Sequence, residues 1–131
     1  IYLDIEDDEL QKAVSAGDAK KITACIEKGI EASTHTMCIV SEKTVRSWWV
    51  PYEIGFSKKS GKGISSLTHK DTTTMPEYLK IGCLISGIKG LNSYLDSIKS
   101  DVKKFSGSIP GTVISEYATN HPLESYMEKY K

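Results

Sequence analysis

Apolar residues recur along this chain with two spacings, and segments of the two kinds alternate. Short apolar runs typical of buried strands cover 1–5, 36–40, 63–67 and 81–86. Between them, apolar residues three and four positions apart predict helices over Ala19–Lys28 and Leu91–Phe105, and a further helix opens near Trp49. Alternating strands and helices predict an α/β fold on a parallel sheet. Thr36–Val40, almost continuously apolar, has the pattern of a central strand buried on both faces.

Polar residues and glycines mark the expected ends of these elements. Asp18 and Ser47 are predicted N-caps, and Gly29 is a predicted helix end. Ser41–Thr44 has the composition of a polar turn. Ile5–Asp18 is rich in acidic residues, so we expect a solvated loop with at most one helical turn, although this loop could instead border a functional site.

The segment Arg46–Gly55, with the sequence RSWWVPYEIG, carries the strongest candidate chemistry. Pro51 is tolerated near a helix start but not in a helix interior. On that helix Trp49 and Glu53 are four residues apart and lie on one face. An aromatic plane beside a carboxylate, after a buried strand, suits a planar cationic or ribose-bearing ligand. The alternative is that both tryptophans are core or interface residues and Glu53 only complements the helix dipole.

Composition narrows the possible partners. The 131 residues contain 17 basic and 17 acidic side chains, which gives no electrostatic case for nucleic acid or an anionic membrane surface. The sequence has no apolar run of membrane-spanning length. Cys25, Cys38 and Cys83 lie in apolar surroundings without C-x-x-C spacing, so we expect buried thiols and a cytoplasmic location.

The histidines offer little further chemistry. His35 is expected to be structural, because no second ligand lies at metal-binding spacing, and no metal site is predicted. His69 follows the strand at 63–67, at the sheet edge where α/β proteins bind ligands, and is a weaker candidate for substrate contact.

Several of these segments resemble bacterial TIR (Toll/interleukin-1 receptor) domains. The third strand of that family and the helix after it are similar to two segments of this chain. The strand end corresponds to Cys38–Ser41, and the helix start corresponds to Ser47, Trp49 and Val50–Gly55. Trp49 and Glu53 fit its Trp-x-x-x-Glu pattern, and Ile1–Asp4 is similar to its second strand. The resemblance covers roughly residues 1–100.

The resemblance implies a flavodoxin-like, three-layer α/β/α fold whose five-stranded parallel sheet has its first strand between the second and third. That first strand and the helix after it have no counterpart here, so the chain reads as a fragment of a longer polypeptide. We expect a TIR-like domain over 1–105 and a partly helical C-terminal extension over 106–131.

The resemblance also implies an NAD⁺-consuming activity, typically in bacterial anti-phage defence or signalling. Glu53 would be the catalytic carboxylate, while Trp49, Ser47, Lys43 and Asp4 would contact the substrate or border the site. NAD⁺ is then a substrate and no cofactor is expected. The resemblance further implies a homo-oligomer formed by TIR–TIR contacts. Hydrolysis and cyclisation share their first step, and the sequence does not decide between them.

Two other functions remain open. The domain could be a non-catalytic TIR assembly module in which Glu53 is structural. Less favoured is an enzyme like the nucleoside deoxyribosyltransferases, in which a glutamate forms a covalent sugar intermediate.

Overall fold

The structure is a computed structural model that describes residues 4–106, with side chains as far as residue 101. Its sheet contains β1 (His35–Val40), β2 (Gly63–Thr68) and β3 (Cys83–Ile85), in the order β1-β2-β3. Both pairings are parallel, and Cys38 lies opposite Ser66 in the register. The predicted parallel α/β sheet is therefore confirmed.

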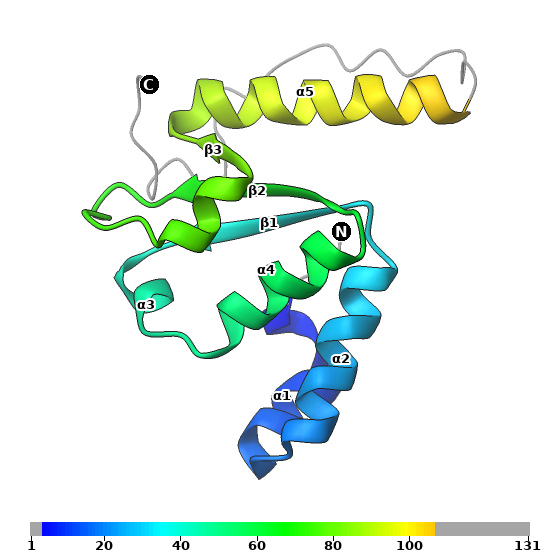
Figure 1. Ribbon diagram of the computed structural model, residues 1–131, viewed down its shortest axis with the longest axis vertical. Helices are drawn as coiled ribbons and strands as arrows, with labels where there is room; N and C mark the ends of the chain where they lie inside the picture. Colours follow the sequence, from blue (N-terminus) through cyan, green and yellow to red (C-terminus); the bar gives the residue numbers. More distant parts are fainter. Residues whose placement is uncertain (1–3, 107–131) are drawn as a thin grey trace.

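Helices cover both faces of this sheet (Figure 1). On one face α5 (Gly87–Ser106) packs through Leu91 against Leu67 and Ile85. On the other face α4 (Trp49–Lys59) packs through Ile54 against Val40. The result is the three-layer, flavodoxin-like α/β/α arrangement expected from the sequence.

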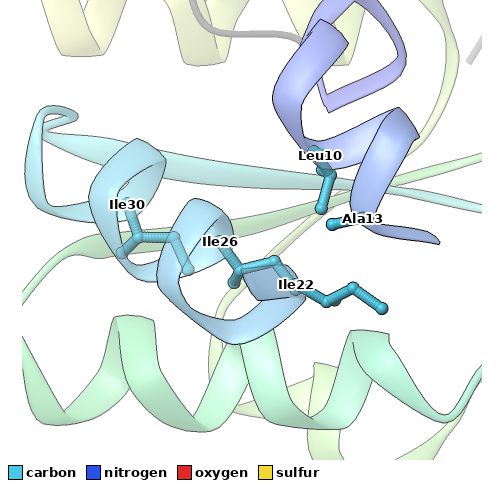
Figure 2. Packing of buried hydrophobic residues seen from close by; sticks show 5 residues of the cluster. All are labelled: Leu10, Ala13, Ile22, Ile26 and Ile30. Carbon is cyan, nitrogen blue, oxygen red and sulfur yellow. The ribbon is translucent and has the colours of Figure 1, made fainter. Parts of the chain in front are cut away.

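A helical pair, α1 (Asp8–Ala16) and α2 (Ala19–Glu31), packs against α4. The two helices meet through a separate apolar cluster, which Figure 2 shows from close by. Its fully buried members are Leu10, Ala13, Ile22, Ile26 and Ile30. This cluster fixes α4 through the partly buried aromatic residues Trp49, Tyr52 and Phe56.

The helix α1 corrects the prediction of an acidic loop over Ile5–Asp18. Asp7 caps the helix by accepting a hydrogen bond from the Leu10 backbone N–H at 3.0 Å. Gly17 ends it in the left-handed conformation, with φ of 65°. Leu10 and Ala13 are buried, so tertiary packing stabilises a helix whose local apolar pattern is short. The acidic residues of the first turn complement the helix dipole.

Other boundaries also differ from expectation. Asp18 caps α2 as predicted, because its carboxylate accepts a hydrogen bond from the Lys21 backbone nitrogen at 3.1 Å. Gly29 does not end this helix as predicted: it is buried inside α2, which continues to Glu31. The expected turn after β1 contains a short helix, α3 (Glu42–Val45), closed by reciprocal hydrogen bonds of Ser41 and Thr44. Short connections of this kind carry too little periodicity to be read as helical from sequence.

The chain ends of the predicted domain are less fully described. Asp4 opens a 3-10 turn, η1 (Asp4–Glu6), and the remainder of the strand predicted at 1–5 lies outside the described residues. The helix α5 begins at Gly87, four residues earlier than predicted. Apart from Ser106, the predicted extension over 106–131 also lies outside the described residues.

The strand β1 is not buried on both faces, contrary to the prediction. Within residues 4–106 it has a strand neighbour on one side only, and Ile39 is 55 % exposed. The helix α5 lies mainly over β2 and β3, so it leaves part of the β1 surface uncovered (Figure 1). Cys83 is likewise exposed rather than buried, because β3 is the other edge strand.

Candidate functional site

The site begins with the start of α4. The Ser47 hydroxyl accepts hydrogen bonds from the backbone N–H groups of Trp49 at 3.3 Å and Val50 at 3.2 Å. The Ser47 hydroxyl thus satisfies the first backbone N–H groups of the helix, as a capping residue does, although Trp48 rather than the predicted Ser47 occupies the N-cap position. Pro51 falls in the first helical turn, where its missing N–H is harmless. The hydroxyl predicted to contact substrate is therefore already engaged with the helix backbone.

One side of α4 is an aromatic face that packs on the α1–α2 pair. Trp49, Tyr52 and Phe56 lie against the cluster that contains Ile22 and Ile26. The rings of Trp49 and Tyr52 meet edge to face, with centroids 6.3 Å apart. Trp49 thus braces α4 against α1 and α2.

Tyr52 links α4 to α2 directly, because its hydroxyl donates a hydrogen bond to the Glu27 carboxylate. This bond, followed by burial and the charge of Glu27, raises the pKa of Tyr52. The sheet-facing side of α4 is held by Ile54, which is 2 % exposed, and by Ser57, whose hydroxyl lies 2.9 Å from that of Thr36. The helix that carries Glu53 is therefore fixed on two sides.

Glu53 lies partly buried between these two contact surfaces. Burial, and secondarily the negative charge of Asp4, raises the pKa of Glu53 above the ordinary glutamate value. Within residues 4–106 the Glu53 carboxylate has no hydrogen bond or ion pair. A half-buried acid without a cationic partner is energetically costly to the fold, and it is the kind of group that functional sites retain.

Two further groups lie in the electrostatic range of Glu53. Burial raises the pKa of the Cys38 thiol to about 11, and the charges of Glu53 and Asp4 add to the effect. Burial also raises the pKa of Tyr78, with further contributions from Cys38 and Glu53. Asp4, Cys38, Glu53 and Tyr78 therefore form one group, which we call the Glu53 cluster.

Four elements assemble this cluster. Asp4 comes from η1, Cys38 from β1, Glu53 from α4, and Tyr78 from the 3-10 turn η2 (Glu77–Ile81). The sequence predicted Glu53 and Asp4 as site residues, and the structure brings these two together. Sequence reasoning missed Cys38 and Tyr78 as site residues. The position of Cys38, on the same strand face as Val40, was an available signal for its place beneath α4.

The other predicted residues lie elsewhere or have other contacts. Lys43 is exposed on α3, and no described contact joins it to Glu53. His69 lies beyond β2, where its Nδ1 is 3.8 Å from the Asp71 carboxylate, and its backbone N–H donates to the Val40 carbonyl at 2.9 Å. The loop that contains His69 thus closes over the end of β1.

Trp48 points away from all of these groups. Its side chain is 92 % exposed, which excludes the core role that the sequence left open. Val45, on the same β1–α4 connection, is 45 % exposed. A large apolar surface on a short connection is a feature of interfaces rather than of cores.

A separate cavity of about 400 Å³ lies between the start of α1 and the second half of α2. Most of its polar lining is acidic, with Lys28 as its one basic residue. Glu53 is not among its lining residues. We therefore place the candidate chemistry at the Glu53 cluster rather than at this cavity.

A parallel sheet covered by helices on both faces is consistent with the flavodoxin-like α/β fold of a TIR domain. The comparison with protein families agrees. The model of the family described as Thoeris protein ThsB, TIR-like domain, matches residues 1–73, and the chain belongs to this family. No curated protein and no solved structure gives a significant match.

The matched segment contains three members of the Glu53 cluster and ends before the fourth, Tyr78. Among the described helices, none is long and apolar enough to cross a membrane.

Proposed function

We propose that this domain cleaves the nicotinamide–ribose bond of NAD⁺, with Glu53 as the catalytic carboxylate. The observation that carries the proposal is the half-buried Glu53 side chain, which lacks a described hydrogen-bond or ion-pair partner and lies on a helix fixed from two sides. Membership of the Thoeris ThsB family supports a role in bacterial anti-phage defence, where NAD⁺ consumption or a nucleotide signal serves that purpose.

One carboxylate is sufficient for this reaction. The bond between ribose C1′ and the pyridinium nitrogen breaks, and its electron pair neutralises the ring as nicotinamide leaves. Because the leaving group is already neutral on departure, no general acid is needed, unlike in ordinary glycosidases. A carboxylate such as Glu53 then stabilises the oxocarbenium-like ribose and orients its hydroxyls.

The second step completes the reaction at C1′. In hydrolysis a water oxygen bonds to C1′ and releases one proton, which gives ADP-ribose. In cyclisation a nitrogen or hydroxyl of the same nucleotide bonds to C1′ instead. Asp4 lies close enough to influence the charge of Glu53 and is proposed to border the bound ribose.

The decisive experiment measures nicotinamide release by the natural full-length protein, at high concentration, beside its Glu53→Gln variant. We expect release by the parent and a loss of at least about a hundredfold in the variant, in line with removal of a group that acts electrostatically in the transition state. Equal turnover by both proteins would show that Glu53 is not catalytic. Identification of the second product then separates hydrolysis from cyclisation.

A second candidate function has its own observation in support. The 92 % exposed Trp48 favours a TIR assembly surface, and assembly without catalysis would leave both proteins inactive in the same assay. We propose that self-association through this surface accompanies catalysis, because TIR domains act as oligomers.

A further inference from the structure

On the basis of the proposed function, we propose that Tyr52, through its hydrogen bond to Glu27, is a positioning residue that holds Glu53 in place for NAD⁺ cleavage. Tyr52 itself does not touch the substrate. Its effect passes through the orientation of α4, the helix that carries both Tyr52 and Glu53.

The α1–α2 pair attaches to the rest of the described fold mainly through α4. Among the described residues, the buried apolar cluster of this pair contains no sheet residue, and the side chains that pack against it from outside the pair are Trp49, Tyr52 and Phe56. In Figure 1 the two helices lie beside α4. The orientation of α4 therefore depends on this junction as well as on the sheet.

Tyr52 supplies the directional contact of this junction. Its ring meets Trp49 edge to face and lies nearly parallel to the ring of Phe56, at an interplanar angle of 20°. Hydrophobic packing of this kind is non-directional. The hydrogen bond from the Tyr52 hydroxyl to the Glu27 carboxylate restricts both distance and direction, and an ionised acceptor makes such a bond stronger.

Glu53 lies between this junction and the sheet contact of α4. Successive residues of a helix are about 100° apart around its axis, so Glu53 falls between Tyr52 on one side and Ile54 on the other. Ile54 is buried against Val40 of β1. With both neighbours held, α4 cannot turn about its axis. Without the Tyr52 hydrogen bond, a small turn moves the half-buried Glu53 side chain toward water.

The pH profile of the activity separates this role from a purely structural one. Burial is the larger cause of the raised Glu53 pKa, and the charge of Asp4 is the smaller one. The other ionisable groups coupled to Glu53 are Cys38 of β1 and Tyr78 of η2. Replacing Tyr52 changes none of these charges. A lower Glu53 pKa in a Tyr52 variant would therefore report greater hydration of the carboxylate.

The first test uses Tyr52→Phe in the natural full-length protein, because this change removes the hydroxyl and retains the ring. We expect kcat to fall about tenfold, the size expected for one lost hydrogen bond to a charged group, with little change in KM, since Glu53 acts in the transition state. The acidic limb of the pH profile should move to lower pH. The matched control is Tyr94→Phe, on α5 at the other face of the sheet, which should change neither kcat nor the acidic limb. All variants are compared at a temperature at which circular dichroism shows them folded.

The second test varies the acceptor. Glu27→Gln keeps a side-chain oxygen that can accept the Tyr52 hydrogen bond, so kcat should stay within about threefold of the parent value. Glu27→Ala removes the acceptor and should match Tyr52→Phe. The double variant with Tyr52→Phe and Glu27→Ala should lose no more than either single variant, because both changes break the same bond.

The outcomes separate the two proposals. If the parent is active but Tyr52→Phe behaves like Tyr94→Phe, Tyr52 is not a positioning residue and the Glu53 site stands. If kcat falls while the acidic limb stays in place, or if Glu27→Gln loses as much as Glu27→Ala, the hydrogen bond does not position Glu53. If the parent releases no nicotinamide, the proposed function is wrong and Tyr52 has no such role.

Discussion

At the scale of single residues, Glu53 is a group whose ionisation opposes folding. Its pKa is raised by burial first and by Asp4 second, so the folded protein favours the protonated acid. The resulting contribution to stability is present below the ordinary glutamate pKa and is lost as pH rises through the raised value. At neutral pH the Glu53→Gln variant should therefore be at least as stable as the parent, although we expect it to lose the proposed NAD⁺ cleavage.

The proposed catalysis requires the ionised form of Glu53, so the raised pKa also predicts the pH profile of the activity. The acidic limb of kcat/KM should lie above the ordinary glutamate pKa of about 4.3. Asp4→Asn removes the second cause of the shift and should move this limb to lower pH. Asp8→Asn, an exposed acid in the first turn of α1, serves as the control. An acidic limb that stays in place in Asp4→Asn would contradict the coupling of these two carboxylates.

The sequence predicts some members of the Glu53 cluster better than others. Glu53 could be found because its spacing from Trp49 places both on one helical face, within a recognisable motif. Tyr78 could not, because it comes from a short 3-10 turn 25 positions further along the chain. That turn lies near α4 only because β2, which precedes it, pairs with β1. A local sequence pattern does not predict such a long-range contact.

At the scale of elements, α4 is the part of the fold that joins the two cores. Its aromatic face contacts the α1–α2 cluster, and its aliphatic face contacts β1 through Ile54 and Val50. The sequence predicted that this helix exists and that Ser47 supplies its capping hydroxyl. It did not predict α1, because nine residues with two buried apolar side chains give a weak periodic signal.

The adjacent tryptophans of this segment should behave very differently when truncated. Trp49→Ala removes an aromatic brace between α4 and α2 and should lower the free energy of unfolding by about 3 kcal/mol. Trp48→Ala truncates a side chain that is 92 % exposed, so it should change the free energy of unfolding by less than about 0.5 kcal/mol. Urea unfolding of both variants tests this difference. Equal losses would mean that Trp49 does not fix α4.

At the scale of the whole molecule, both edge strands of the described sheet carry uncovered apolar side chains. Ile39 on β1 and Leu84 on β3 are each more than half exposed, and neither strand has a second neighbour within residues 4–106. The sequence predicted Thr36–Val40 as a central strand because continuous hydrophobicity is typical of strands covered on both faces. The hydrophobic pattern of a segment indicates how apolar the strand is. It does not indicate whether the strand is central or at an edge, because that depends on which other strands pair with it.

Trp48 provides the test of self-association at this scale. It is the most exposed of the large apolar side chains described, and it lies on the β1–α4 connection close to the helix that carries Glu53. Because removing such a surface from water favours association, we expect specific NADase activity to rise with protein concentration in the parent. Trp48→Ala should weaken this rise and reduce the sedimentation coefficient at high concentration.

The matched control is Leu84→Ala, which truncates an exposed apolar residue on the opposite edge strand. Because Leu84 is far from the β1–α4 connection in the sheet order, we expect parental sedimentation and activity from this variant. If Trp48→Ala and Leu84→Ala behave alike, the exposed indole has no special part in assembly. If Trp48→Ala abolishes association but retains full activity in dilute solution, the site is complete within one chain, and Asp4 acts on the Glu53 of its own molecule.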